Sequence, residues 1–206
     1  MRSSQLGAPT APAAAAYIGL ANDHLRSAQV KMLLVGGEPG TGKSTLALQL
    51  SDRLGAVVLR TDEVRRRIPL GAGPDRYTPE AVTATYLELL LEARRLVGLG
   101  EHVILDATWS TQLHRTLARL AASETSCELT ELHCTLPRDE ADARIRRRSA
   151  EGGDLSEATV EVAAALAARF EGWPEATEVP THGTPESVAD RAAALVGSAA
   201  RPGSRP

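Results

Sequence analysis

The sequence predicts an α/β protein in which a five-stranded parallel sheet lies between two layers of helices, as a three-layer sandwich. Three observations predict this fold. Short apolar runs of strand type alternate with helix-type segments along most of the chain. A glycine-rich turn joins the first of these strands to the helix after it. An aspartate directly follows a later apolar strand, at the sheet edge where α/β proteins bind ligands.

The predicted elements occupy one domain. The chain has 206 residues, 43% of them hydrophobic, and a net charge of -3, which suits a single packed domain. Strands are expected at 31–36, 56–60, 102–106, 128–134 and, with a less regular pattern, 176–181. Helices are expected at 44–54, 62–68, 79–98, 110–123, 138–150, 156–170 and 185–197. Residues 1–16 are expected to form a flexible leader, 17–30 an N-terminal helix, 31–197 the α/β domain and 198–206 a flexible tail.

The glycine-rich turn has the spacing GxxxxGK[ST] of a phosphate-binding loop. Glycines let the backbone take positive φ, so that consecutive N–H groups and the helix N-terminus point at a polyphosphate. Lys43 then reaches the β- and γ-phosphates, and Ser44 is a predicted Mg²⁺ ligand. The alternative is a glycine turn with a structural role only. The predicted ATP-binding residues are Gly37, Glu38, Pro39, Gly40, Thr41, Gly42, Lys43, Ser44 and Thr45.

A carboxylate also follows the second strand. Asp62 is the candidate group that orients an acceptor hydroxyl and accepts its proton during phosphoryl transfer. Arg65, one helical turn further on, can hold an anionic part of the acceptor. The alternative is that Thr61 or Asp62 caps the next helix and that the arginines after it form a solvated face.

The third strand ends in Asp106, which has the Walker B pattern of a carboxylate that holds Mg²⁺ directly or through water. Ala107 stands where hydrolytic motor ATPases usually carry a glutamate, which favours transfer to a substrate over ATP hydrolysis. Trp109 lies beside the predicted acceptor site. It either stacks on a planar acceptor or fills a gap in the core.

Arginines after the fourth strand predict a lid. Arg144 and Arg148 are four residues apart and share one helix face, and a glycine-containing segment at 151–154 follows as a candidate hinge. Such arginines can stabilise transition-state charge and exclude water when the lid closes. The alternative is that they pair on the surface with the acidic residues of the same helix, Asp139, Glu140 and Asp142.

Several other classes of site are not indicated. The five histidines show no metal-ligand spacing, and Cys127 and Cys134 are expected on opposite faces of one strand without a disulfide. No apolar run is long enough to cross a membrane, and an ATP-dependent activity points to a cytoplasmic protein. The weakly acidic net charge neither requires nor excludes a nucleic-acid substrate.

The chain resembles the small P-loop kinases that include phage-type polynucleotide kinases, zeta toxins and chloramphenicol phosphotransferase. The segments GEPGTGKST, RTDEVRRR, VILDATW and LPRDEADARIRRR occur in that family's order. The resemblance implies a catalytic role for Asp62, substrate-phosphate binding by Arg65, and lid roles for Arg144 and Arg148. A closer likeness, through AYIGLANDHLRSA and LRTDEVRRR, is to a bacterial kinase-like module that follows an aminoglycoside-phosphotransferase-like domain.

The sequence therefore predicts an ATP- and Mg²⁺-dependent kinase that phosphorylates a hydroxyl of a small molecule or nucleotide-like acceptor. Lys43, Asp62, Arg144 and Arg148 are the predicted catalytic residues. Asp62, Arg65, Asp106 and Trp109 are the predicted acceptor site, and Ser44 and Asp106 the metal ligands. A nucleic-acid acceptor is compatible with this prediction but not favoured. The alternative is an ATP-binding regulatory or partner-dependent module with little turnover of its own.

Overall fold

The computed structural model of the protein describes residues 14–21, 29–68, 77–151 and 160–198. It contains one sheet of five parallel strands in the spatial order β2-β3-β1-β4-β5. The strands are β1 (Lys31–Gly36), β2 (Val57–Arg60), β3 (Val103–Asp106), β4 (Glu128–Thr135) and β5 (Thr177–Pro180). All five predicted strands are confirmed, with ends within one residue of the predicted bounds.

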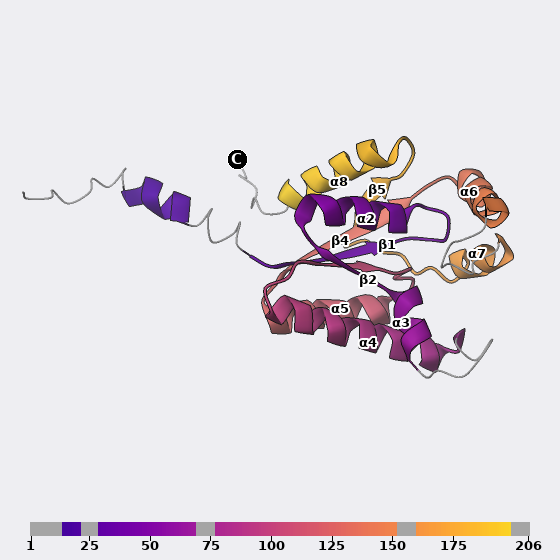
Figure 1. The fold of residues 1–206 in the computed structure, drawn as a ribbon, viewed down its shortest axis with the longest axis horizontal. Helices are drawn as coiled ribbons and strands as arrows, with labels where there is room; N and C mark the ends of the chain where they lie inside the picture. The colour runs from indigo at the N-terminus through magenta and orange to yellow at the C-terminus, as the bar shows by residue number, and fades with distance from the viewer. Residues whose placement is uncertain (1–13, 22–28, 69–76, 152–159, 199–206) are drawn as a thin grey trace, which may run out of the picture.

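Helices cover both faces of the sheet, as Figure 1 shows. On one face α2 (Lys43–Leu54) packs against α8 (Pro185–Ser198), and on the other α4 (Pro79–Gly98) packs against α5 (Gln112–Thr125). The short α3 (Thr61–Arg67) follows β2 directly. The remaining helices, α6 (Arg138–Glu151) and α7 (Val160–Ala167), contact each other beyond the carboxyl ends of the strands.

The central strand β1 separates the two apolar layers of the core. Met32 and Leu34 belong to the cluster that includes α4 and α5, whereas Leu33 and Val35 belong to the cluster that includes α2 and α8. Successive side chains of a strand point to opposite faces, so a strand buried on both sides needs a continuous apolar run. The run that predicts β1 therefore also explains its central position.

Some helix bounds differ from the prediction. Helix α5 begins at Gln112 rather than at 110, because Trp109 has a positive φ of 52° and Thr111 is extended. The N-terminal helix occupies 14–21 instead of starting at 17. Residues 29 and 30, the predicted end of that helix, are not helical. Outside the described residues lie most of the leader (1–13), residues 22–28, all of the predicted hinge except Glu151 together with the start of the predicted helix 156–170 (152–159), and most of the tail (199–206).

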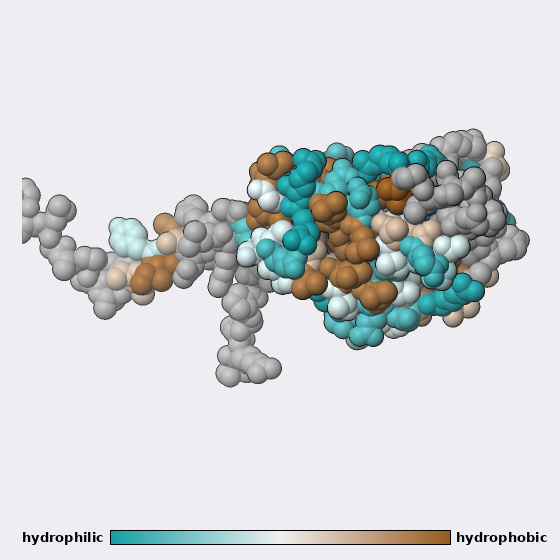
Figure 2. All heavy atoms as spheres, turned by 90° about the horizontal axis from the view of Figure 1, so that it is seen from below, coloured by the Kyte–Doolittle hydropathy of each residue, from teal (hydrophilic) through white to brown (hydrophobic). Residues whose placement is uncertain are grey.

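The outer face of the α4 and α5 layer is partly apolar, as the view in Figure 2 shows. Leu87 and Leu91 of α4 and Leu113 and Leu120 of α5 are all more than half exposed. None of the described helices has both the length and the apolar character that crossing a bilayer requires.

A buried histidine lies between α4 and α5. The His114 ring stacks on Tyr86, with ring centroids 4.0 Å apart and planes 7° from parallel. Its Nδ1 and Nε2 atoms lie 2.8 and 3.4 Å from the hydroxyl oxygens of Thr111 and Thr83. Burial lowers the pKa of His114, and the negative charge of Glu171 offsets part of that effect.

The lowered pKa of His114 should make the free energy of unfolding depend on pH. A lowered pKa means that the unfolded chain binds a proton at His114 more readily than the folded chain. Stability from His114 is therefore complete above its ordinary pKa of 6.5 and is lost as the pH falls below that value. The free energy of unfolding can be measured by urea denaturation between about pH 7.5 and about pH 5.5. As the pH falls, it should decrease less steeply in His114→Gln than in the wild type, and the two slopes should differ by at most about 1.4 kcal/mol per pH unit.

The comparison isolates His114 because His133, whose pKa burial also lowers, is present in both proteins. Equal slopes in the wild type and in His114→Gln would contradict the prediction.

Candidate active site

The phosphate-binding loop connects β1 to α2 through three glycines in positive φ. Gly37, Gly40 and Gly42 have φ of 141°, 84° and 83°. Gly42 is the N-cap residue of α2 and supplies no side-chain hydrogen bond to the helix. The first N–H groups of a helix have no partner within it, so this N-terminus is open to an anion. Within the loop, the hydroxyl of Thr41 donates to the Glu38 carbonyl at 2.7 Å.

Two of these glycines are also required by close packing. A Cβ added at Gly37 would lie 2.6 Å from the carbonyl oxygen of Cys134 at the end of β4. A Cβ added at Gly40 would lie 2.6 Å from the carbonyl oxygen of Ala141 in α6. The loop backbone therefore passes directly beneath α6, which is the predicted lid.

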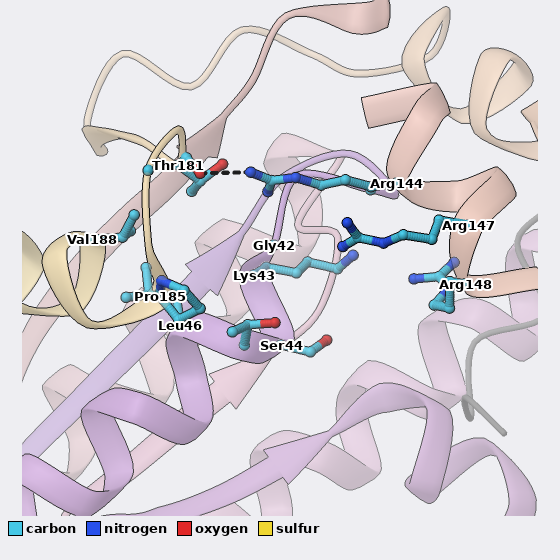
Figure 3. A pocket seen from close by; sticks show the side chains of 13 residues that line it. Gly42, Lys43, Ser44, Leu46, Arg144, Arg147, Arg148, Thr181, Pro185 and Val188 are labelled. Carbon is cyan, nitrogen blue, oxygen red and sulfur yellow. Dashed lines mark hydrogen bonds between the residues drawn. The ribbon is translucent and has the colours of Figure 1, made fainter. Parts of the chain in front are cut away.

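The loop and α6 enclose one cavity of about 470 Å³, a volume that suits a small-molecule ligand. Figure 3 shows that the side chain of Lys43 and the guanidinium groups of α6 point into the same space. Leu46, Pro185 and Val188 form an apolar part of the wall at a distance from these cations. The lining residues are Gly40, Gly42, Lys43, Ser44, Thr45, Leu46, Arg144, Arg147, Arg148, Thr181, Gly183, Pro185 and Val188.

Thr181 connects the parts of this cavity. Its hydroxyl donates to the Thr41 carbonyl of the loop at 2.6 Å and lies 3.2 Å from the Thr135 carbonyl at the end of β4. Its own carbonyl accepts from Arg144 Nη2 at 2.9 Å. Thr181 is 4% exposed, so it acts as a buried link between the loop, the sheet and the lid.

The predicted metal carboxylate lies at the same edge of the sheet. Asp106 is 4% exposed, and its Oδ2 accepts from Arg60 Nε at 3.1 Å. Its Oδ1 is buried and has no hydrogen-bond partner among the described residues. A buried carboxylate oxygen without a donor is unfavourable unless a ligand satisfies it. Asp106 therefore has one oxygen left for such a ligand.

The predicted acceptor residues from the second strand end lie together. Arg65 Nη1 and Asp62 Oδ1 form an ion pair of 2.7 Å, and the guanidinium lies over the Tyr77 ring at 5.1 Å from its centroid. Arg65 Nε is buried and without a hydrogen-bond partner among the described residues. Neither Thr61 nor Asp62 caps α3, because the N-cap residue is Arg60.

The structure does not place Trp109 where an acceptor can stack on it. The side chain is fully buried, its Nε1 donates to the Leu105 carbonyl at 3.1 Å, and its backbone N–H donates to Tyr86 Oη at 3.0 Å. Its positive φ turns the chain so that the indole packs back into the core. Of the two interpretations of Trp109, the core-filling one describes its position, and we leave Trp109 out of the acceptor site.

The acidic residues of α6 are only partly paired with its arginines. Arg138 forms an ion pair of 2.9 Å with Asp142 and lies 3.7 Å from Glu38 of the loop. Arg144 and Arg148 instead line the cavity. Arg138 thus joins α6 to the loop, whereas Arg144, Arg147 and Arg148 line the cavity and Arg146 is exposed.

Sequence reasoning missed four kinds of contributor. These are Arg60 beside Asp106, Arg147 in the lid, the Tyr86 support of Trp109, and the turn after β5 that carries Thr181, Gly183 and Pro185. A signal for the last was available, because ligands bind at the carboxyl ends of all the strands of such a sheet.

The strand order, the loop and the cavity define the class of protein: a P-loop NTPase fold of the kinase-like type. Residues 32–173 match the AAA_33 family of AAA domains, and the chain belongs to this family.

Curated relatives in mycobacteria are uncharacterized. Proteins Rv2004c of Mycobacterium tuberculosis (strain ATCC 25618 / H37Rv) and Mb2027c of Mycobacterium bovis (strain ATCC BAA-935 / AF2122/97) are each 41% identical over 196 residues, which cover 90% of this chain. The chain spans only 39% of the length of each relative. The narrower likeness to polynucleotide kinases, zeta toxins and chloramphenicol phosphotransferase stays a prediction. The likeness to a bacterial module that follows an aminoglycoside-phosphotransferase-like domain also stays a prediction.

Several solved kinase structures have the same fold. The APS kinase CysC of Mycobacterium tuberculosis, in complex with AMPPNP and APS, matches with a TM-score of 0.65 and 19% identity over 82% of this chain and 99% of that chain. A sugar kinase from Janibacter sp. HTCC2649 matches with a TM-score of 0.59 and 19% identity over 84% and 99%. A gluconokinase from Sinorhizobium meliloti 1021 matches with a TM-score of 0.59 and 15% identity over 84% and 94%.

Adding a methyl group at Gly40 should damage the site. Ala at this position is strained by the positive φ and collides with the Ala141 carbonyl, so the loop and α6 must separate. We expect Gly40→Ala to lower the free energy of unfolding by about 1–3 kcal/mol and the affinity for ATP by about tenfold or more. Urea denaturation and isothermal titration calorimetry measure the two effects.

Gly98→Ala at the end of α4 is the matched control, because an added Cβ there meets nothing within 4 Å. It should leave ATP affinity unchanged. Wild-type ATP affinity in Gly40→Ala would show that the contact between loop and lid is not needed for binding.

Proposed function

We propose that the protein is an ATP-dependent kinase that transfers the γ-phosphate to a hydroxyl group of a small molecule or nucleotide-like acceptor. The observation that carries this proposal is the cavity itself. It joins a glycine-rich loop, the open N-terminus of α2 and three arginines of α6 around Lys43. Two carboxylates outside the cavity lining lie nearby in the fold: Asp106 ends β3, which is next to β1, and Asp62 follows β2, which is next to β3.

ATP fits the cavity in one orientation, with its phosphates at the cationic end and its base against the apolar wall. The loop amides, Lys43 and the α6 arginines form the end for the phosphates, since all are donors or cations. Leu46, Pro185 and Val188 offer the apolar wall that a purine base needs. The residues proposed for ATP therefore extend the predicted loop set by the turn after β5.

Mg²⁺ fits Ser44 and Asp106. Ser44 is the second residue of α2 and lines the cavity, and the buried Oδ1 of Asp106, at the end of the strand next to β1, lacks a partner among the described residues. Hydroxyl and carboxylate oxygens are the ligands that Mg²⁺ prefers, directly or through water. Ser44 and Asp106 would hold the ion, which when bound neutralises charge on the β- and γ-phosphates.

The acceptor half lies at the end of β2. Arg65 holds the Asp62 carboxylate in one position and has a spare buried donor at Nε for an anionic part of the acceptor. During transfer the acceptor oxygen forms a bond to the γ-phosphorus while the bond to the β,γ-bridging oxygen breaks. The hydroxyl proton passes to Asp62, and ADP leaves with the electron pair of the broken bond.

The lid arginines act on the transferred group. Arg144, Arg147 and Arg148 come from one helix and line the same cavity as Lys43, and Figure 3 shows that Arg144 extends to Thr181. Cations in a cavity sheltered from water stabilise the charge that spreads over the γ-phosphoryl oxygens. APS kinase and gluconokinase neighbours of the same fold support phosphoryl transfer, and a reaction that consumes ATP favours a cytoplasmic location.

Substitution of the proposed base should affect phosphoryl transfer and ATP binding differently. Asp62→Asn keeps a similar shape but cannot accept the acceptor proton. We expect it to lower kcat by about 100-fold or more while ATP affinity stays within about twofold of the wild type. Lys43→Ala should weaken both, because Lys43 contacts the phosphates in the ground state and in the transition state. Transfer of labelled γ-phosphate and calorimetric ATP binding are the measurements.

Glu63→Gln is the control, since Glu63 is an exposed carboxylate in the same helix. The acceptor is identified first, by ATP consumption across nucleosides, sugars, antibiotics and 5′-hydroxyl oligonucleotides. ATP binding without transfer to any of these would favour the regulatory or partner-dependent module. Full activity in Asp62→Asn would remove Asp62 from the mechanism.

A further inference from the structure

We infer that Arg60 is a positioning residue for the metal carboxylate: it fixes Asp106 through one oxygen and leaves the other free for Mg²⁺ or its bound water. The inference rests on the proposed function for the identity of the metal and nucleotide. No motif in the sequence marks Arg60, which is the last residue of β2 and lies 46 residues before Asp106 in the chain.

The sheet register brings the two side chains together. Arg60 and Asp106 are direct partners in the parallel pairing of β2 with β3. Partners in adjacent parallel strands project to the same face, so Arg60 can reach Asp106 without any distortion of the backbone. The contact is therefore set by the strands rather than by a loop, which makes it suited to holding a fixed geometry.

Burial makes this ion pair matter more than a surface pair. The side chain of Asp106 is 4% exposed and that of Arg60 is 16% exposed. A carboxylate out of water is costly unless a cation and hydrogen bonds compensate it, and removal of one partner leaves an uncompensated buried charge. Arg60 supplies both the positive charge and the hydrogen bond.

The hydrogen bond from Arg60 uses one carboxylate oxygen of Asp106 and leaves the other available for a ligand. Arg60 donates through Nε to Oδ2, while Oδ1 has no hydrogen-bond partner among the described residues. A planar guanidinium that donates from a fixed direction restricts rotation of the carboxylate, which a lysine ammonium does not do. Outer partners of this kind orient metal ligands, and their loss typically lowers metal affinity by about 10- to 100-fold.

Arg60 is separate from the arginines of α6. Like Asp106, it is absent from the residues that line the cavity, whereas Arg144, Arg147 and Arg148 are among them. It is also two residues from Asp62 and serves as the N-cap residue of α3. A shift of Arg60 would therefore disturb Asp106 and the start of the helix that carries the proposed base.

The test is the Mg²⁺ dependence of nucleotide binding, without turnover. Affinity for the non-hydrolysable analogue AMPPNP is measured by calorimetry in EDTA and across a MgCl₂ series. For Arg60→Met we expect the half-saturating Mg²⁺ concentration to rise by about tenfold, with the metal-free affinity within about twofold of the wild type. Asp106→Asn should show the same pattern.

The double variant distinguishes positioning from general damage. If Arg60 acts through Asp106, Arg60→Met with Asp106→Asn should raise the half-saturating Mg²⁺ concentration no further than Asp106→Asn alone. It should also melt at a higher temperature than Arg60→Met, because no unpaired carboxylate stays buried. Arg60→Lys keeps the positive charge but not the Nε geometry. If Arg60→Met fails to fold, Arg60→Lys and the double variant still test whether Arg60 positions Asp106 for Mg²⁺.

Arg94→Met is the matched control, because Arg94 forms an exposed ion pair with Glu124 between α4 and α5. It should leave Mg²⁺ dependence unchanged. Wild-type Mg²⁺ dependence in the Arg60 variants, an equal loss of metal-free affinity, or additive effects in the double variant would each overturn the inference. Failure to find any phosphate acceptor would instead count against the kinase proposal and leave this binding result standing.

Discussion

The parallel register of β1, β2 and β3 is the constraint on which the rest of the site depends. Asp106 pairs with Val35 on one side and with Arg60 on the other, so the three strands end at the same level. Two backbone hydrogen bonds extend this alignment beyond the strands: Ala107 N–H donates to the Val35 carbonyl at 3.3 Å and Gly37 N–H to the Thr108 carbonyl at 3.2 Å. The first residue of the phosphate loop is thereby tied to the segment after Asp106, the proposed metal ligand. Main-chain pairing thus aligns the loop with the strand ends that precede the proposed base and carry the proposed metal ligand.

Close packing also fixes the start of α6, the predicted lid, on the phosphate loop. Helix α6 rests on Gly40 through Ala141 and Ile145, and Arg138 at its start lies near Glu38 of the loop. Arg144 lies between these contacts and donates to the Thr181 carbonyl, whereas Arg147 and Arg148 come after them in the helix. The phosphate loop and residues 138–145 of α6 therefore pack as one unit.

The features that the sequence predicted depend on residues close together in the chain, whereas the contacts that it missed join residues far apart in the chain. The strands, the loop and the paired arginines of α6 are local patterns, because spacing within ten or twenty residues decides them. The partner of Asp106 is 46 residues away and the partner of the Thr41 carbonyl is 140 residues away. No local pattern encodes such contacts, since they follow from strand order. For Trp109 the local pattern was misleading. Its neighbours in sequence suggested the acceptor site, but its positive φ directs the indole into the core.

The distribution of charge divides the site into two electrostatically different halves. Both carboxylates at the strand ends are already paired with arginine, Asp62 with Arg65 and Asp106 with Arg60. Among the described residues that line the cavity, four are cationic and none is acidic. The donor half therefore gains most from a polyanion, whereas the acceptor half is close to neutral before any substrate arrives. In the proposed reaction, an acceptor that brings an anionic group would bind the Nε of Arg65 while Nη1 keeps its ion pair with the Asp62 carboxylate. Two donors of one guanidinium would then hold the acceptor next to the proposed base.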